Sequence, residues 1–435
     1  MGKDVVADIV DKIIEAYNEL GRQELEAART ALIDTYAVMA AAPRVYKKAS
    51  LYAMRLGETG RKEGIRIPGL GHMSTPRGAS AAMAFLSHSL EYDDWLAEAL
   101  IHVGSVSIPI ILAYGRERQM SEILKTIIAS YEAALYLGSY YGRSHYTYWH
   151  STSSTGALVA AITYILVRHG PQRKLLESTL DIASAYIGGL WTINNSQALY
   201  KPLSPTNAVL TGLLAGAAAE TEPARIPGAL HESCRLLRGE CTMKSFEKRG
   251  IVLNGYKLYP TCRHSHTTIE AVEKILEKTQ VYPDGIQEIK VRLFKEAINV
   301  AGKQDPVSVE EARFSIPHLI ATMLVHRSVD FETISKSLND PRIKSLRRKV
   351  VLVEDKDYTA RYPEEQPSTV TIKIRNKEYS ETVLHPKGDP RRGDNILGVL
   401  HKARSLKKYM TPIDQAVLDK LIDAEPDMIL AEILE

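Results

Sequence analysis

The sequence has few cysteines and no long apolar run. Its three cysteines, Cys234, Cys241 and Cys262, form no C-x-x-C pair, and their spacing fits no common run of iron–sulfur ligands. An odd number of cysteines in a long chain suits a reducing cytoplasm. No stretch of about eighteen apolar residues occurs, which excludes a membrane-spanning helix of ordinary length.

An excess of charge of one sign is also absent. The 55 Lys and Arg residues nearly balance the 52 Asp and Glu residues, and the formal net charge is +3. This balance gives no reason to expect nucleic acid or a membrane surface as a partner. With 435 residues, of which 45% are hydrophobic and 25% charged, the chain is long enough for two or three globular domains.

The N-terminal stretch lacks the unbroken apolar segment of a signal peptide. Val6, Val10, Ile13, Tyr17 and Leu20 recur at helical spacing, with acidic and basic residues between them. This pattern predicts an amphipathic helix that belongs to the mature protein.

Up to about residue 250 the sequence is patterned as a succession of helices. Apolar residues recur three and four positions apart, Ala and Leu are abundant, and Gly or Pro marks the breaks. Stretches that are apolar all round, such as "TGALVAAITYILV", are typical of helices buried inside a large bundle. The expected helices cover residues 24–42, 78–90, 96–101, 105–114, 118–138, 155–169, 174–191 and 207–219.

Past residue 284 the hydrophobic period changes to that of strands. "IQEIKVRLF" alternates as strands do, "KVVLVED" is a second expected strand, and "TVTIKIRNKEYSETV" predicts a hairpin that turns near Asn376. Between them, "PVSVEEARFSIPHLIATMLV" predicts one helix, with Ser308 and Glu311 as a capping box. After "HPKGDPRRGDN" the pattern is helical again. We therefore expect an α+β fold: a large all-helical domain, residues 1–252 completed by 400–435, and a smaller α+β lid domain, residues 253–399.

Four stretches place cationic or imidazole side chains at the start of a predicted helix. The free N–H groups and the dipole at such an end attract anions, and an added cation strengthens that preference. The side chains are His102 in "IHVGSVSIPIILA", His150 in "YWHSTSSTGALVAA", Lys201 in "LYKPLSPTNAVLTGLLAG", and Arg263, His264 and His266 in "CRHSHTTIEAV". If these ends converge, they form a pocket for a polycarboxylate or a phosphate.

The stretch "SLEYDDW" supplies the opposite charge through Glu91, Asp93 and Asp94. A carboxylate beside imidazoles is what proton transfer requires, because one group accepts a proton while another donates one. Each candidate also has a purely structural interpretation. Glu91 would be a solvated helix end, His102 and His150 hydrogen-bonded core histidines, Lys201, Lys257 and Arg263 surface cations, and Cys262 a small buried hydrophobe.

These residues lie in motifs that resemble the MmgE/PrpD family, in the family's order and through nearly the whole chain. The motifs are "FLSHSLEYDDW", "HVGS", "YWHSTSSTGALVAA", "YKPLSPTNAVLTGLLAGAAA", "YKLYPTCRHSH", "ARFSIPHLIA" and "HPKGDPRR". The family includes 2-methylcitrate dehydratases, cis-aconitate decarboxylases and iminodisuccinate epimerases. The resemblance implies a helical domain completed by C-terminal helices, a lid domain, an active site between the two, a homodimer, and no metal or other cofactor.

Carried over by position, the resemblance implies a set of site residues. The implied residues are Glu91, Asp94, His102, His150, Lys201, Lys257, Cys262 and His266. Tyr259, Arg263, His264 and His318 are further candidates for binding substrate. Four positions depart from the family pattern, namely Glu91, Trp95, Val103 and His318, so the substrate of a known member cannot be assumed. Cys262 agrees with the dehydratase pattern.

The expected protein is a cytoplasmic, cofactor-independent lyase that dehydrates a 2-hydroxy tri- or dicarboxylate such as 2-methylcitrate or citrate. His150 or Glu91 would be the base and His102 the acid, while Lys201 and Lys257 would bind carboxylates. Decarboxylation of the cis-aconitate type or epimerisation at the same site is an alternative, because these reactions also stabilise a carbanion-like charge. A carboxylate-binding protein without catalytic activity is an alternative of another class.

Overall fold

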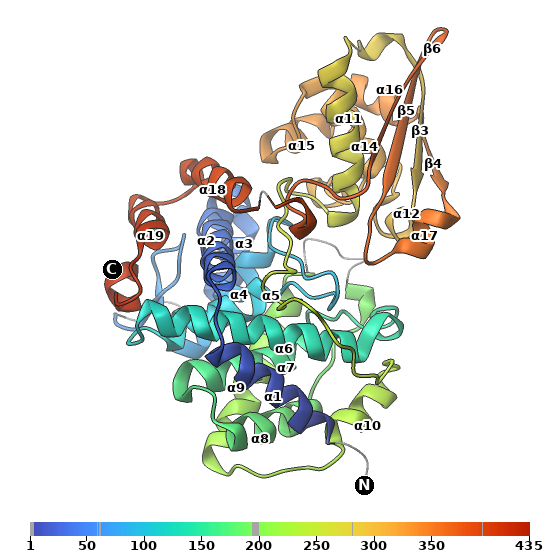
Figure 1. Ribbon diagram of the computed structural model, residues 1–435. Helices are drawn as coiled ribbons and strands as arrows, with labels where there is room; N and C mark the ends of the chain where they lie inside the picture. Colours follow the sequence, from blue (N-terminus) through green and yellow to red (C-terminus); the bar gives the residue numbers. More distant parts are fainter. Residues whose placement is uncertain (1–3, 59, 61, 194–199, 281, 394) are drawn as a thin grey trace. The chain divides into compact units, whose positions relative to one another are not determined.

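The computed structural model describes residues 4–58, 60, 62–193, 200–280, 282–393 and 395–435. These residues form two compact units (Figure 1). The first comprises Met1–Tyr256 and Ile396–Glu435, and the second comprises Lys257–Asn395. Helices dominate the first unit, while the second combines helices with a four-stranded sheet. The expected α+β fold class is therefore confirmed.

The first unit contains most of the helices. They are α1 (Val5–Asn18), α2 (Arg22–Val45), α3 (Lys47–Leu56), α4 (Pro76–His88), α5 (Val103–Tyr114), α6 (Met120–Tyr146), α7 (Ser154–His169), α8 (Arg173–Ser184), α9 (Leu203–Thr221), α10 (Ala229–Leu236), α18 (Asn395–Leu406), η5 (Lys407–Tyr409), α19 (Pro412–Asp423) and α20 (Leu430–Leu434). A short antiparallel pair, β1 (Ile65–Arg66) and β2 (Met73–Ser74), also occurs in this unit. The helical domain is thus not free of strands.

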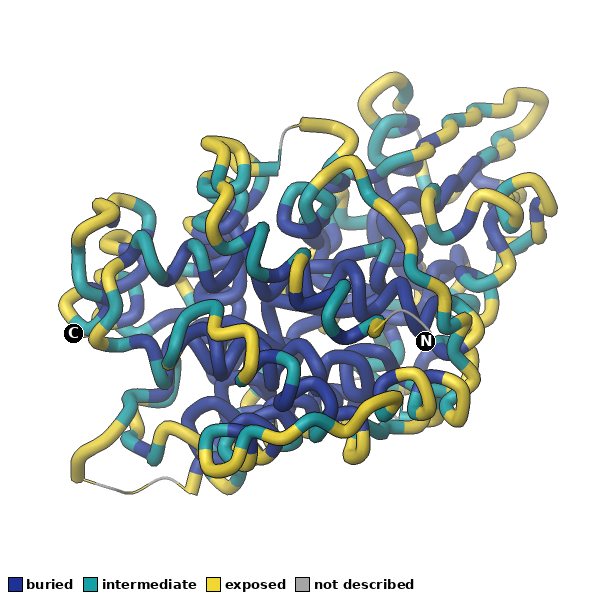
Figure 2. The backbone as a smooth tube through the Cα atoms, turned by 60° about the horizontal axis from the view of Figure 1, so that its bottom comes forward, coloured by how far each residue is buried: buried dark blue, intermediate teal, exposed yellow. Residues whose placement is uncertain are grey.

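The core of the first unit lies around α5 and α7. Every residue from Ser154 to Val167 is buried, as expected for the stretch that is apolar all round. Buried backbone is dark blue in Figure 2. Small residues allow close packing here: an added Cβ on Gly212 of α9 would lie 2.5 Å from the Ala160 side chain of α7. Helices α7 and α9 therefore approach each other closely, and they fix the chain segments that precede them.

The expected helix over residues 96–101 is wrong. A bridge between Leu96 and Ile101 closes a tight turn there, with Leu100 in the left-handed region at φ 58°. Trp95, just before the turn, pairs with Gly255. This partner is distant in the sequence, so local hydrophobic spacing gave no sign of it.

The C-terminal helices pack within the first unit. The buried Asp414 of α19 accepts hydrogen bonds from the Tyr36 hydroxyl at 3.0 Å, from Arg66 at 2.7 Å and from the Gly69 amide at 3.0 Å. In α18, the buried Lys402 ammonium lies 2.7 Å from the Asp34 carboxylate of α2. These buried polar contacts join the end of the chain to its first third.

The second unit is a sheet with helices packed on it. The strand order is β4-β3-β5-β6, where β3 (Ile286–Leu293) runs parallel to β4 (Val350–Glu354) and antiparallel to β5 (Ser368–Ile374), and β6 (Lys377–Val383) pairs antiparallel with β5. Helix α11 (His266–Lys278) packs against β5, β6 and α14 (Ile316–His326). The remaining elements are η2 (Arg263–Ser265), η3 (Pro283–Gly285), α12 (Lys295–Ala301), α13 (Val309–Ala312), α15 (Phe331–Ser337), α16 (Pro341–Arg347), α17 (Lys356–Arg361) and η4 (Pro390–Arg392).

The expected hairpin is confirmed, because β5 ends at Ile374 and β6 begins at Lys377. The expected single helix over residues 306–325 is wrong, since it divides into α13 and α14. Ser308 caps α13 through the Glu311 amide as predicted, but Ser315 caps a second helix through the His318 amide. Pro317 occupies the first turn of α14, where a proline favours a new helix start.

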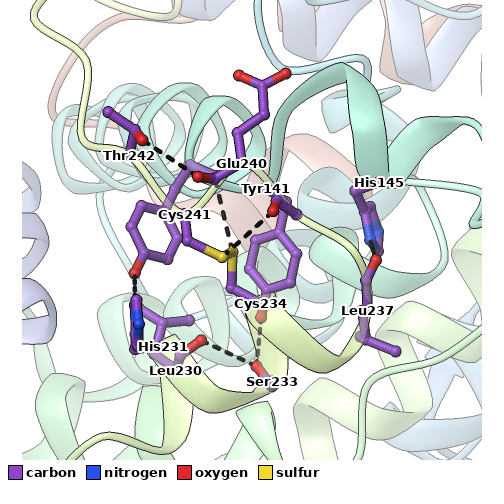
Figure 3. The surroundings of a disulfide bond; sticks show 12 residues. Tyr141, His145, Leu230, His231, Ser233, Cys234, Leu237, Glu240, Cys241 and Thr242 are labelled. Atoms are coloured by element: carbon purple, nitrogen blue, oxygen red, sulfur yellow. Dashed lines mark hydrogen bonds between the residues drawn. A yellow bond between two sulfur atoms is a disulfide. The ribbon is translucent and has the colours of Figure 1, made fainter.

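Cys234 and Cys241 form a disulfide (Figure 3), and Cys262 is a buried thiol outside this bond. The odd cysteine count did not indicate this pair. It forms because the chain reverses after α10: the Gly239 amide donates to the Cys234 carbonyl at 2.8 Å, and Arg238 has a left-handed φ of 59°. In the described part of the chain, no helix is both long and apolar enough to cross a bilayer.

Candidate active site

One carboxylate oxygen at the end of α4 contacts two imidazoles. Oδ2 of Asp93 lies 2.6 Å from Nδ1 of His88 and 3.1 Å from Nδ1 of His102. Nδ1 of His102 also lies 2.6 Å from the backbone oxygen of Asp94, so it is the protonated nitrogen of the neutral ring. Proton exchange between His102 and a ligand would therefore use Nε2.

Lys201 and Glu91 form a buried ion pair at 2.5 Å, with side chains 6% and 2% exposed. Lys201 precedes α9, and Glu91 follows α4. Glu91 has a φ of 52°, in the left-handed region that residues other than Gly, Asn and Asp rarely adopt. Such backbone strain persists where the surroundings enforce it, and it is common at functional sites.

His150 completes this cluster. Its ring centroid lies 6.3 Å from that of His88 and 6.0 Å from Trp191, and its amide donates to the Gly189 carbonyl at 2.9 Å. Burial, reinforced by the positive charge of Lys201, lowers the pKa of His150 well below its usual range. Nδ1 is buried and has no hydrogen-bond partner among the described residues. A neutral imidazole has one unprotonated nitrogen and can therefore act as a general base.

Asp94, predicted as a catalytic residue, contacts the start of α5. Its carboxylate accepts hydrogen bonds from the Gly104 amide at 3.1 Å and from the Tyr131 hydroxyl at 2.6 Å. Burial raises the pKa of Asp94 to about 7, although the Tyr131 bond acts in the opposite direction. The carboxylate thus anchors the start of α5, where His102 is the residue before the helix.

Four predicted residues of the first unit are therefore gathered together: Glu91, His102, His150 and Lys201. The sequence analysis missed His88 and did not place Asp93 among the site residues. Both are fully buried. A histidine five residues before an aspartate, at the end of a predicted helix, was the signal that could have identified them. Trp95 lies against the His102 ring at 5.1 Å, so this departure from the family pattern touches the cluster directly.

His88, Asp93 and His102 also carry the atom types that bind metal ions, and one such atom from each lies within 4.8 Å of the others. Nδ1 of His88 and Oδ2 of Asp93 form a hydrogen bond of 2.6 Å, and Nδ1 of His102 lies 3.1 Å from the same oxygen. A metal ion would have to replace the His88–Asp93 hydrogen bond. The geometry therefore fits a shared proton network better than a metal centre.

In the second unit, Arg263 is a buried cation with few partners. Its guanidinium lies 3.3 Å from the Asp389 carboxylate, while Nε and Nη1 have no hydrogen-bond partner within the described residues. Burial lowers the pKa of Arg263 despite Asp389. Lys257 is also buried, at 1% exposure. Buried guanidinium donors without partners are typical of an anion-binding site.

The neighbours of Arg263 form polar and aromatic contacts within the second unit. The Cys262 amide donates to the Arg313 carbonyl at 3.0 Å, and the Tyr259 hydroxyl donates to Glu273 at 2.9 Å. The rings of Tyr259 and His266 lie 5.3 Å apart. His264 packs edge-on against two aromatic rings, those of Phe294 and Tyr362.

His318 is buried on α14, and its Nε2 lies 2.8 Å from the Ser337 hydroxyl of α15. Burial and then the positive charge of Arg347 lower the pKa of His318 to about 4. The ring is therefore neutral and held inside the unit. These contacts suit a structural histidine, and a substrate-binding role for His318 stays a prediction.

A buried cluster of imidazoles, carboxylates and a lysine defines an enzyme that moves protons. Comparison with known families agrees with this class. The model of the MmgE/PrpD N-terminal domain matches residues 7–224, and that of the MmgE/PrpD C-terminal domain matches residues 259–426. The chain belongs to the MmgE/PrpD family.

Two curated relatives represent different reactions. Cis-aconitate decarboxylase of Aspergillus terreus (strain NIH 2624 / FGSC A1156) is 24% identical over 411 residues, covering 83% of this chain and 82% of the relative. 2-Methylcitrate dehydratase of Salmonella typhimurium is 26% identical over 181 residues, covering 38% of this chain and 37% of the relative. The expected family and the expectation of a lyase-type enzyme are confirmed, and the subclass is left open.

Proposed function

We propose that the protein is a cofactor-independent hydro-lyase that removes water from a 2-hydroxy tri- or dicarboxylate such as 2-methylcitrate or citrate. The observation that carries the proposal is that two histidines of the cluster have different electrostatic surroundings. His150 is kept neutral by burial, whereas His102 has a carboxylate 3.1 Å from Nδ1 that stabilises positive charge on its ring. One ring suits a base and the other an acid.

In the proposed reaction, His150 takes a proton from the carbon next to a substrate carboxylate. The electron pair of that C–H bond forms the new double bond, and the C–O bond to the hydroxyl group breaks. Protonated His102 donates its proton to the leaving oxygen, so water departs. Lys201 would bind a substrate carboxylate and stabilise the enolate-like charge, with Glu91 as the partner that this carboxylate replaces. The alternative is that Glu91, and not His150, is the base that removes the proton.

The supporting residues have positioning roles in this proposal. Asp93 holds His102 and His88 through their Nδ1 atoms, and Asp94 holds the start of α5 next to His102. Neither residue would touch the substrate, but both would fix the direction of Nε2 of His102.

The second unit is proposed to bind substrate carboxylate through its cations and to act as the lid. Arg263 supports this proposal best, because its buried guanidinium has donors without partners among the described residues. The proposed substrate-binding residues of this unit are Lys257, Tyr259, Arg263, His264, His266 and His318, and Cys262 is proposed as a catalytic residue.

Decarboxylation is the second candidate reaction. The observation in its favour is that the fungal relative named cis-aconitate decarboxylase matches 83% of this chain. The two reactions differ in the product: dehydration gives an unsaturated acid with the same number of carbons, whereas decarboxylation releases carbon dioxide.

The test is incubation of the purified protein with 2-methylcitrate, citrate, cis-aconitate and iminodisuccinate, followed by NMR of the products. An unsaturated acid with all carbons retained supports the hydro-lyase, and loss of a carbon contradicts it. Binding of an acid in calorimetry without any product, under conditions where the protein is folded, would instead identify a carboxylate-binding protein.

We also propose a homodimer that works in the cytoplasm. An apolar face on and beside α9 supports the dimer: Leu210 and Leu214 are 40% and 57% exposed, and Tyr186, Leu190 and Tyr200 are 62%, 57% and 42% exposed. Large apolar side chains that are exposed together on one surface commonly mark protein–protein contacts. Light scattering should give twice the monomer mass, and Leu214→Glu should lower it to that of the monomer.

A further inference from the structure

The two residues of the Cys234–Cys241 disulfide differ in exposure. Cys234, in the last turn of α10, is fully buried. Cys241 is partly exposed and lines a cavity of about 590 Å³ together with Val6, Tyr140 and His231. A small nucleophile that enters this cavity would meet Cys241 first. We therefore take Cys241 as the residue that is attacked and Cys234 as the leaving group.

The loop closed by the disulfide holds a kink in α6. The amides of Glu240 and Cys241 donate to the carbonyls of Tyr141 and Tyr140 at 2.9 and 2.8 Å. The next residue of α6, Gly142, has non-helical angles of φ 68° and ψ −167°. Beyond the kink, the Glu240 carboxylate accepts a hydrogen bond from the Arg143 amide at 2.8 Å. The loop thus satisfies backbone groups that a continuous helix would satisfy by itself.

The same loop fixes His145 in the last turn of α6 (Figure 3). Nδ1 of His145 lies 2.9 Å from the Leu237 carbonyl oxygen and therefore carries the proton. Nε2 is then the acceptor for the Ser154 hydroxyl, 2.7 Å away. Burial lowers the pKa of His145 to about 4, in agreement with a neutral ring.

Ser154 connects this contact to the active-site cluster. It begins α7, and its hydroxyl lies 3.3 Å from the His150 backbone oxygen. The Ser154 amide donates to the same oxygen at 3.1 Å. The disulfide loop, His145, Ser154 and the His150 backbone therefore form one continuous set of contacts.

We propose that Cys234–Cys241 is a reversible thiol–disulfide site at which a low-molecular-weight thiol alters the placement of His150. The effect on catalysis rests on the proposed function, because it takes His150 as the base. The thiol exchange itself does not.

The exchange proceeds in two steps with glutathione as the thiol. A glutathione thiolate attacks Sγ of Cys241, the S–S bond breaks, and its electron pair leaves on Sγ of Cys234, which takes up a proton. A second glutathione thiolate attacks the glutathione sulfur of the mixed disulfide and releases Cys241, which is also protonated. Two thiols are oxidised to glutathione disulfide, and the protein disulfide is reduced to two thiols.

Reduction removes the covalent link that closes the loop. Cys241 has a φ of 54° and Arg238 one of 59°, both in the left-handed region that these residues disfavour. Without the link, the loop can leave this conformation and withdraw the Leu237 carbonyl from His145. We expect His150 to lose its fixed position, so that kcat falls while substrate binding changes little.

The attack site is tested with single-cysteine variants and glutathione disulfide as the probe. In Cys234→Ser, Cys241 should form the mixed disulfide about tenfold or more faster than Cys234 does in the matched variant Cys241→Ser. Mass spectrometry of the intact protein and of its peptides gives both rates. Equal rates, or faster modification of Cys234, would overturn the proposed direction of attack.

The coupling to His150 is tested by NMR and by kinetics. The ring C2–H signal of His150, assigned with His150→Gln, should shift when dithiothreitol reduces the protein and return on reoxidation. On an acid that turns over, kcat should fall about fivefold or more with little change in KM. The double variant Cys234→Ser/Cys241→Ser should match the reduced protein, and His145→Gln should no longer respond to reduction.

An unchanged His150 signal in both redox states would overturn the coupling, whether or not any acid turns over. If no acid turns over but the signal shifts, the proposed function fails and the thiol–disulfide site stands. The two proposals therefore fail separately.

Discussion

Oδ2 of Asp93 lies 3.1 Å from Nδ1 of His102, and both side chains are buried. Together with the backbone oxygen of Asp94, 2.6 Å from the same Nδ1, this contact sets which nitrogen of His102 carries a proton in the neutral ring and which is presented to a ligand. Because Oδ2 also contacts His88 at 2.6 Å, a single carboxylate oxygen orients two of the three clustered rings.

Replacing this carboxylate by an amide should therefore impair catalysis without removing volume. In Asp93→Asn, the side-chain oxygen can accept from one ring only, and the NH₂ group would face the other. We expect kcat to fall by about 10²–10⁴, with a smaller change in KM. Steady-state kinetics measures this, and a thermal melt checks the fold. A kcat within about twofold of the wild type would contradict the positioning role.

His150→Gln should lower kcat by about 10²–10⁴, because it removes the proposed base and retains a polar side chain of similar size. The wild-type pH profile gives a second measurement. Since burial lowers the pKa of His150 well below its usual range, the base stays neutral in mildly acidic solution. The acidic limb of kcat/KM should lie below about pH 6.5, the ordinary histidine value. A limb at or above that pH would point to another base.

Acid should destabilise the fold through the buried neutral histidines. The pKa values of His145 and His318 are lowered to about 4, so the unfolded chain binds more protons than the folded one as the pH falls below the ordinary value. Their contribution is present at neutral pH and is lost on acidification towards pH 4. Each ring should reduce the free energy of unfolding by about 2 kcal/mol between about pH 7 and pH 5.

Urea unfolding at a series of pH values measures this effect. His318→Gln serves as the matched variant, because it removes one titrating ring and retains a hydrogen-bonding group for Ser337. Its stability should depend less steeply on pH than that of the wild type. Identical slopes for the two proteins would show that His318 does not contribute.

Lys257→Ala should lower kcat/KM if this lysine binds a substrate carboxylate. Loss of a charge-assisted contact costs about 1.5–3 kcal/mol, which corresponds to a fall in kcat/KM of roughly tenfold to a hundredfold or more. The exposed Lys290 of β3 provides the control, since Lys290→Ala removes the same charge from the same unit. Wild-type kinetics for Lys257→Ala would exclude the carboxylate contact. A large drop in melting temperature would make the buried lysine structural.

Removal of metal ions should leave activity unchanged. His88 and Asp93 are joined by a hydrogen bond of 2.6 Å, which a metal ion bound between them would have to break. We expect full turnover after exhaustive chelation and no stoichiometric metal in elemental analysis. Loss of turnover that a divalent ion restores would show that His88, Asp93 and His102 bind metal.

Local patterns predicted those elements whose partners are close in the sequence or whose surroundings are uniform. The all-apolar stretch became the buried α7, and the alternating stretch became the hairpin of β5 and β6. Predictions failed where a distant residue decides the conformation. A helix was expected over residues 96–101, but the chain forms a turn there, directly after Trp95 pairs with the distant Gly255. The disulfide was not expected, because it depends on the chain reversal after α10 that brings Cys241 to Cys234.

The same distinction applies to the candidate site. The cationic groups at helix starts could be predicted from the sequence, because each depends only on the residues next to it. From the sequence, Asp93 could be recognised only as one of several acidic residues after α4. Its contact with both imidazoles depends on the path of the chain between α4 and α5. His88 was hidden because a histidine inside a predicted apolar helix is more often part of the core.

Three hydrogen bonds to Asp414 from distant parts of the sequence bear on the order of folding. Tyr36, Arg66 and Gly69 are synthesised more than 300 residues before their shared acceptor, at sequence separations of 378, 348 and 345. During synthesis these donors emerge long before Asp414 and bond to water until it appears, whereas Lys257–Asn395 is contiguous and can fold as soon as it emerges. The inserted unit can therefore fold first. The helical unit can form its hydrogen bonds to Asp414 only after the last part of the chain has been synthesised.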